Sequence, residues 1–325
     1  MANRRTFLVW VVVASGAVFL VIALRRMEWG MFFASLAGVY MPKAAIAALL
    51  IAGSAAGRAL RWSIIAGRPL TYWHFWSAAA LGYLGNMVYP ARAGEAIRMT
   101  ALCRFARVPP GEAVATAVVD RICDGILTAG LLLIAVWGAG AAELAWPSAL
   151  FAAAFGGAAG VLWLVSLGGA RAKRWIGIWS VRLPAKIGDR IKKWSGQAVD
   201  GIVSLRQAGR MIPAAMLTVL VFIADVGEVW LMFGAFGWNL PLSAAVTLQL
   251  FLLAGTSLPG APAFVGVYQA ACVLALRLFG VAEAAALAFS AVLHILMFGV
   301  LVIQGVLVLG ARGTGNLRSF RLESW

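Results

Sequence analysis

Long apolar runs alternate with short polar or basic segments along this chain, and the apolar runs indicate its expected elements. Roughly 20 apolar residues in a helix cross the hydrocarbon core of a bilayer, and several runs reach that length with few charges. The pattern predicts an all-α, polytopic membrane protein with one integral membrane domain over residues 1–325. Its clear spans are expected at residues 7–24, 44–60, 113–137, 147–168, 212–237 and 284–310.

Residues 72–107 form an apolar region that is broken in the middle. The break lies in the segment NMVYPARAGEAIRM, where Pro90 precedes three charges at Arg92, Glu95 and Arg98. Proline ends one helix or begins the next, and the piece that follows is too charged to face lipid. We therefore expect two helices joined by a polar turn.

Residues 242–280 are interrupted in a similar way. Their segment SLPGAPAFVGVYQ carries Pro259, Pro262 and Gly266 shortly before Gln269. Proline and glycine at this density interrupt a helix. The chain therefore predicts a second broken pair of helices.

Positive charge predicts the orientation of these elements, because Lys and Arg accumulate in cytoplasmic loops. Between residues 171 and 210 basic residues outnumber acidic ones by ten to two, whereas segments 138–146 and 238–241 carry no Lys or Arg. The basic 171–210 loop and both termini, including the tail 311–325, are expected in the cytoplasm.

This orientation requires each broken pair to begin and end on one side of the membrane. The two pairs are then re-entrant hairpins in inverted orientation. Alternatively, each pair is two full spans, because two crossings also return the chain to the side on which it began. Inverted broken helix pairs build the central site of secondary transporters. Irregular backbone at membrane depth is tolerated where protein buries it or where it lines a cavity, so we expect the two turns to line one.

Composition excludes a soluble globular domain. The chain is 63% hydrophobic and 12% charged, against roughly 45–50% and 25% in soluble domains. Topology accounts for the net charge of +15, so no nucleic-acid partner is expected. Basic and apolar residues alternate between 175 and 205, which predicts an amphipathic helix on anionic lipid, with a cytosolic protein partner as the alternative.

Four acidic residues lie inside the predicted spans. Asp120 and Asp124 share one face of their helix, with Arg121 three residues before Asp124, and Asp225 and Glu228 share a face of another. A charge at such depth costs roughly 2.5–3.5 kcal/mol and normally faces a cavity or pairs with an opposite charge. These residues therefore predict a polar cluster within the membrane.

The expected partners of these acids are the arginines Arg58, Arg61, Arg92 and Arg98. Guanidinium groups also match the oxygens of a phosphate. Arg92, Glu95 and Arg98 follow Pro90 at i, i+3 spacing, at a helix start whose free N–H groups attract anions. We expect Arg92 and Arg98 to contact phosphate and Glu95 to position them or meet a cationic head group. Purely structural ion pairs are the alternative.

The chain offers little for cofactor or metal chemistry. His74 and His294 are the two histidines, and the three cysteines lack metal-ligand spacing. No nucleotide-binding loop or hydrolase elbow is present. No cofactor, metal or catalytic residue is therefore expected, and the protein is not expected to be an enzyme.

The two broken segments resemble those of a known family. GYLGNMVYPARAGEAIRMTALCRF and the following AVATAVVDRICDGI are similar to the first block of the lysylphosphatidylglycerol synthase transmembrane-domain family, and LPGAPAFVGVYQAACVLAL is similar to its second. The resemblance implies a flippase-like protein of the bacterial cytoplasmic membrane, here a stand-alone member without the aminoacyl-transferase domain. The residues that fall on the two blocks are Pro90, Arg92, Gly94, Glu95, Arg98, Asp120, Arg121, Asp124, Pro259, Pro262, Gly266 and Gln269, the last at a position where the family often has an acid.

Taken with the resemblance, these patterns predict a protein that flips a polar-headed membrane lipid through a central polar cavity. The resemblance allows an aminoacylated or anionic phospholipid, a hopanoid or a polyprenyl-linked glycolipid. Two alternatives are a membrane-embedded lipid-modifying transferase and a scaffold subunit for a lipid-synthesis enzyme. A homodimer is a further candidate assembly, because Gly53-x-x-x-Gly57 and Gly156-x-x-x-Gly160 favour close helix packing.

Overall fold

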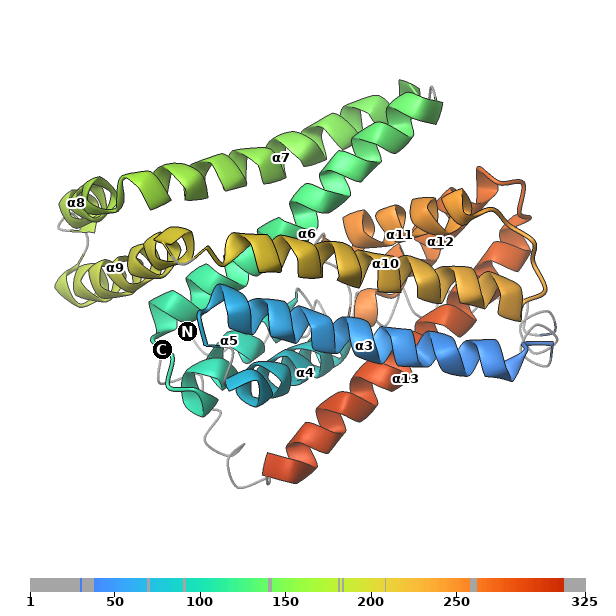
Figure 1. Ribbon diagram of the computed structural model, residues 1–325, viewed down its shortest axis with the longest axis horizontal. Helices are drawn as coiled ribbons and strands as arrows, with labels where there is room; N and C mark the ends of the chain where they lie inside the picture. Colours follow the sequence, from blue (N-terminus) through green and yellow to red (C-terminus); the bar gives the residue numbers. More distant parts are fainter. Residues whose placement is uncertain are drawn as a thin grey trace.

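The part of the chain that the structure describes is helical (Figure 1). This computed structural model describes Gly30, Arg182 and residues 38–68, 71–89, 92–139, 142–180, 184–207, 209–257 and 262–312. The predicted span 7–24, the prolines Pro90 and Pro259, and residues 313–325 of the predicted tail lie outside the described residues. The described elements are α3 (Met41–Ile65), α4 (Tyr72–Val88), α5 (Ala93–Phe105), α6 (Pro110–Ala139), α7 (Ala142–Leu167), α8 (Gly169–Ser180), α9 (Ala185–Gln207), α10 (Met211–Ala235), α11 (Leu242–Ser257), the short 3-10 helix η2 (Pro262–Phe264), α12 (Val267–Arg277) and α13 (Glu283–Arg312).

Four of the described helices are long and apolar enough to cross a membrane, namely α3, α7, α10 and α13. They cover the spans that the sequence predicts at 44–60, 147–168, 212–237 and 284–310, so the prediction of an all-α membrane protein is confirmed. The predicted span 113–137 corresponds to α6, which is 30 residues long and extends about 45 Å at 1.5 Å per residue.

Helices α3 and α10 form an antiparallel pair in the middle of the molecule (Figure 1). Lys43 near the start of α3 donates to the carbonyl of Gly234 near the end of α10. Further along, a Cβ added at Gly57 would lie 2.9 Å from the Val221 side chain, so small residues allow the backbones to approach closely. This register brings Arg58 level with Asp225.

The first broken region is a helical hairpin of α4 and α5. A Cβ at Gly85 would lie 2.9 Å from Gly94 Cα, and one at Gly82 would lie 2.7 Å from Arg98 Cβ, so α5 folds back along α4. The turn passes through Arg92, which has φ 57° and ψ 35° in the left-handed region. Small residues on both helices therefore permit the close contact that the hairpin needs.

The second broken region consists of α11, η2 and α12. Here too α12 returns along α11, because a Cβ at Gly255 would lie 3.2 Å from Val267. Ala263 and Phe264 have φ of 54° and 57°, so left-handed residues occur at this break as they do at Arg92. Both broken pairs are thus present as elements, while their re-entrant depth and inverted orientation in the membrane stay predictions.

Several apolar clusters surround these hairpins, and two of them show how the hairpins are joined. The larger one joins α3, α10, α11, α12 and α13, with Phe233 and Phe289 at 5.2 Å between ring centroids. A smaller cluster contains Met87 from the first break, Ala263 from the second and Leu301 from α13. The two breaks, far apart in the sequence, therefore meet in the interior.

The basic segment expected as one amphipathic helix contains two, α8 and α9 (Figure 1). Helix α9 packs on α6, since the Gly111 N–H donates to Gln197 Oε1 at 3.2 Å and a Cβ at Gly111 would overlap the Trp194 carbonyl. Trp175 and Trp179 of α8 are exposed. Part of α9 therefore contacts protein, and the contact of this segment with anionic lipid stays a prediction.

Candidate functional site

A cavity of about 220 Å³ lies among α3, α4, α6, α10, α11, α13 and the two breaks. Helices with mostly apolar outer faces enclose it, yet its lining is rich in charge. The charged side chains that line it are Arg58, Arg92, Arg121, Asp124, Asp225 and Glu228. Buried charges persist in such surroundings only when they are paired or serve a function, so the contacts of each one matter.

Arg58 of α3 and Asp225 of α10 form one wall of the cavity. The Arg58 Nη2 donates to Asp225 Oδ2 at 2.5 Å, and Nη1 donates to Oδ1 at 3.3 Å. Ser54, one helical turn before Arg58, also donates to Asp225. This bidentate contact neutralises the carboxylate and fixes the guanidinium. The sequence predicted that an acid in this helix would pair with an arginine.

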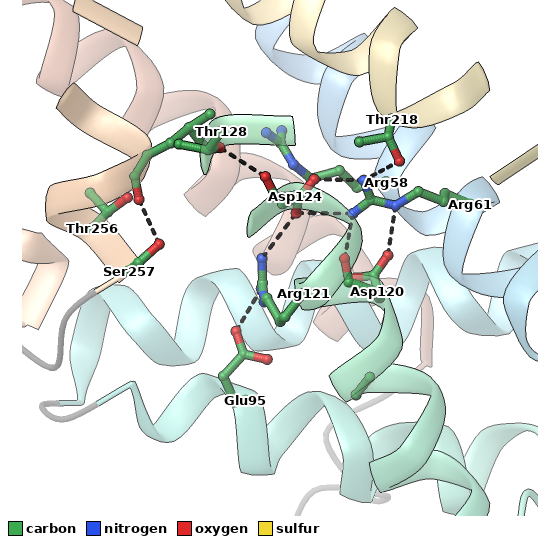
Figure 2. A network of polar contacts seen from close by, with 12 residues as sticks. Arg58, Arg61, Glu95, Asp120, Arg121, Asp124, Thr128, Thr218, Thr256 and Ser257 are labelled. Carbon is green, nitrogen blue, oxygen red and sulfur yellow. Dashed lines mark hydrogen bonds and ion pairs between the residues drawn. The ribbon is translucent and has the colours of Figure 1, made fainter. Parts of the chain in front are cut away.

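Arg61 joins α3 to α6 behind that wall (Figure 2). Its Nε donates to Asp120 Oδ1 at 2.8 Å, and its two Nη atoms donate to the oxygens of Asp124 at 2.5 and 2.9 Å. A further bond reaches Thr218 of α10 at 3.0 Å. Arg61 is fully buried and does not line the cavity, so it acts as a cross-link between three helices.

Arg98 of α5 is also buried and does not line the cavity. Its Nε lies 2.7 Å from Glu95 Oε2 and its Nη1 lies 3.3 Å from Asp120 Oδ2. Its guanidinium also stacks over the Trp62 ring at 4.7 Å. Arg98 therefore differs from Arg92, which lines the cavity, although both were expected from the sequence to contact phosphate.

Glu95 and Arg121 connect α5 to α6 (Figure 2). Arg121 Nη2 donates to Glu95 Oε1 at 2.6 Å, and its Nη1 lies 3.7 Å from Asp124 Oδ2. Asp120, which precedes Arg121 in the chain, instead contacts Arg61 and Arg98. The carboxylate of Glu95 thus pairs with Arg98 and Arg121, whereas the sequence led us to expect it to position Arg92 and Arg98.

The start of α5 differs from the anion site expected there. The Gly94 N–H donates to Asn86 Oδ1 at 2.9 Å, and the Glu95 N–H donates to the Arg92 carbonyl. These donors are therefore not free for an anion, because a side chain on the partner helix caps one of them. The side chain of Arg92 remains as the candidate anion ligand.

Arg92 is the cavity arginine that forms no ion pair among the described residues. Its guanidinium lies 5.7 Å from the centre of the Phe264 ring, so a residue of the first break contacts the second break. Its buried Nε has no hydrogen-bond partner in the part of the chain described. A buried donor of this kind is costly unless a ligand or water accepts from it.

The second break is held by a hydrogen-bonded chain that ends at α13. Gln269 Oε1 accepts from the Gly266 N–H at 2.8 Å, while its Nε2 donates to His294 Nδ1 at 3.1 Å. Since Nδ1 accepts, Nε2 of His294 carries the proton and donates to the Ala263 carbonyl at 2.8 Å. Gln269 and Gly266 therefore shape the turn and do not line the cavity, and neither does Pro262.

Two residues of the cavity have acceptors without partners among the described residues. Glu228, 7% exposed, forms no hydrogen bond or ion pair there, and Gln249, 6% exposed, has an unsatisfied Oε1. Gln249 was not among the site residues expected from the sequence. The signal that could have identified it is an amide side chain in the otherwise apolar run of α11.

An apolar groove of about 380 Å³ adjoins the cavity between α5, α6 and α7. Met99, Val118 and Ile122 lie along it, and Arg92, Arg121 and Phe155 line both spaces. Phe155 packs directly on Gly125, where any side chain would overlap its ring. The polar cavity therefore continues into an apolar surface past Arg92 and Phe155.

The described residues offer no metal centre, because they contain no group of three His, Cys, Asp or Glu that could hold an ion. Fold and site together define a helical membrane protein with a charged internal cavity between two broken helix pairs. The family model described as the lysylphosphatidylglycerol synthase TM region matches residues 7–305. The chain belongs to this family, which is consistent with a role related to membrane lipids. Neither a curated protein nor a solved structure matches the chain.

Proposed function

We propose that this protein flips a polar-headed lipid across the bacterial cytoplasmic membrane, with both termini in the cytoplasm. The observation that carries the proposal is a charged cavity inside an apolar helical body, bordered by both broken helix pairs. A phosphate head group pays a high desolvation cost in hydrocarbon, and arginine side chains reduce that cost inside a cavity.

The fixed ion pairs and the unpaired arginine have different parts in this proposal. Arg61 and Arg98 hold the cavity wall together because carboxylates engage their donors. Arg92 has no such partner among the described residues and lines both the cavity and the apolar groove. A lipid with its phosphate at Arg92 would leave its acyl chains in the groove, in contact with apolar side chains.

The basic helices α8 and α9 are proposed to rest on anionic lipid at the cytoplasmic surface. Trp175 and Trp179 are exposed on α8, and the segment carries most of the excess positive charge predicted for the cytoplasmic side. Anionic lipid attracts a basic surface by about 1 kcal/mol per Lys or Arg near it. This contact would fix the orientation of the domain and is separate from the cavity.

The test is lipid translocation by purified protein in proteoliposomes. Dithionite quenches phospholipids that are labelled on the acyl chain when they lie in the outer leaflet. Labelled lipid in the inner leaflet is protected, so a loss of this protection reports movement between the leaflets. We expect wild type to move at least one phospholipid, and Arg92→Ala and Glu95→Gln to slow it about tenfold or more, since each removes a charged contact in or beside the cavity. Arg277→Ala is the matched control, because Arg277 is exposed at the end of α12.

Two results would count against the flippase. Wild-type rates in Arg92→Ala would remove the cavity arginine from the mechanism. No movement of any probe by folded protein would favour the transferase or the scaffold. Product formation from a labelled donor identifies a transferase, and a phenotype that depends on residues 171–210 but not on Arg92 identifies a scaffold.

A further inference from the structure

The polar groups that line the cavity fall into two sets. In the first set, each charge is offset by another side chain: Arg58 pairs with Asp225, and Arg121 contacts Glu95 and Asp124. These contacts make the wall electrically balanced. The second set consists of groups that have no hydrogen-bond or ion-pair partner among the described residues, and these are the groups available to a ligand.

The second set contains one cationic donor, at the first break. Arg92 lines the cavity without an ion pair among the described residues, although the Glu95 carboxylate attracts it from a longer distance, and its Nε donor is buried and unsatisfied. Its contact with the Phe264 ring holds the guanidinium at the junction of the cavity and the groove. A phosphodiester oxygen is a suitable acceptor for such a donor.

The second set also contains acceptors on α10 and α11. Glu228 follows Asp225 by three residues, so the two share a face, but Arg58 engages Asp225. Gln249 lies on the adjacent helix with its Oε1 unsatisfied, and both side chains are more than nine-tenths buried. Two buried acceptors, one of them a carboxylate, in one cavity match a cationic donor with several N–H groups.

From these unmatched groups we infer that the transported head group is a zwitterion, with a phosphodiester at Arg92 and an ammonium group at Glu228 and Gln249. The inference rests on the proposed function and names the class of its substrate. A head group of this kind satisfies one cation and one anion of the cavity at once. An anionic head group without an ammonium would leave the Glu228 carboxylate buried and unmatched, which is unfavourable.

A head-group comparison tests the inference. Wild type is offered phosphatidylethanolamine and phosphatidylglycerol, each labelled on the acyl chain so that the head group is intact, in vesicles of otherwise equal composition. We expect phosphatidylethanolamine to move about tenfold faster, and Glu228→Gln to abolish the difference by slowing phosphatidylethanolamine alone, because it removes the charge that faces the ammonium. Gln249→Leu should slow it by a smaller factor, since it removes a neutral acceptor.

A binding measurement tests the head-group preference independently of lipid translocation. Short-chain phosphatidylethanolamine should raise the thermal midpoint of detergent-solubilised wild type more than phosphatidylglycerol does, and Glu228→Gln should lose this difference. Glu283→Gln is the matched control, because Glu283 is exposed at the start of α13. Equal binding and equal movement of both lipids by wild type, or a preference that survives in Glu228→Gln, would overturn the inference. Absence of movement with selective binding would instead overturn the flippase proposal alone.

Discussion

Arg61 of α3 donates to both carboxylate oxygens of Asp124 of α6, at 2.5 and 2.9 Å, from a position without solvent exposure. The same guanidinium bonds Asp120 through Nε. One cation therefore serves two buried anions on a single helix face. Removal of that cation would leave Asp120 with its longer contact to Arg98 and Asp124 with its longer contact to Arg121, in surroundings that solvate carboxylates poorly.

Arg61→Ala is expected to destabilise the protein severely, by about 3–5 kcal/mol, because it breaks a buried pair on one side only. Arg61→Lys should retain part of the stability, since an ammonium keeps the charge but cannot reproduce the planar set of contacts. The thermal midpoint in detergent and the yield of monodisperse protein measure both effects. An Arg61→Ala variant as stable as Arg277→Ala would contradict the cross-linking role.

Arg58 and Asp225 should be energetically coupled across the interface of α3 and α10. Asp225→Asn and Arg58→Gln each leave one charge unpaired, whereas the double variant leaves none. The double variant is therefore expected to be more stable than the sum of the two single effects, by about 0.5–3 kcal/mol. A double-mutant cycle from thermal unfolding measures this, and strictly additive effects would show that the contact contributes no coupling.

Gly94→Ala should separate the helices of the first hairpin. A Cβ at this position would overlap the Gly82 carbonyl and lie 2.5 Å from Asn86 Oδ1, and backbone cannot move away cheaply. We expect a loss of about 1–3 kcal/mol or more. Gly130→Ala is the control, because its Cβ would meet nothing within 4 Å, and it should leave stability unchanged or slightly raised. Equal stability of the two variants would contradict the close contact of α4 and α5.

Gln269→Ala is expected to loosen the second break. It removes the acceptor of the Gly266 N–H and the donor to His294, so we expect a cost of about 1–3 kcal/mol. Faster amide exchange over residues 262–277 would report the change locally. Gln304→Ala is the control, since Gln304 on α13 has no hydrogen bond in the described part of the chain. Unchanged exchange in Gln269→Ala would remove the proposed role of this residue in shaping the turn.

The sequence could predict the helices and the signs of the buried charges. Acids at membrane depth require arginines, and the expected pairing is found for Asp225 with Arg58 and for Asp124 with Arg61. Which arginine pairs with which acid depends on the register of α3 against α10 and α6. A local sequence pattern does not contain this information. The packing of α5 on α6 likewise gives Arg98 two carboxylate partners, while Arg92 forms no ion pair in the described chain.

Other features depended on contacts between distant segments. The start of α5 has the pattern of an anion site, but Asn86 on the returning helix takes its N–H. Gly156-x-x-x-Gly160 has the spacing of a packing motif, yet Cβ atoms at both glycines would meet nothing within 4 Å among the described residues. Gln249 was missed because it is uncharged, and its unsatisfied oxygen appears only once the cavity is assembled.

The most direct test of the account is to obstruct the cavity in a protein that already transports lipid. Thr256 lines the cavity, and Thr256→Cys in a background without the native cysteines provides a thiol for a charged, water-soluble reagent. Arg277→Cys, exposed at the end of α12 and outside the four long apolar helices, is the control. We expect modification of Thr256→Cys to stop lipid translocation in proteoliposomes while modified Arg277→Cys remains active. Full translocation by the modified Thr256→Cys protein would contradict passage of the head group through this cavity.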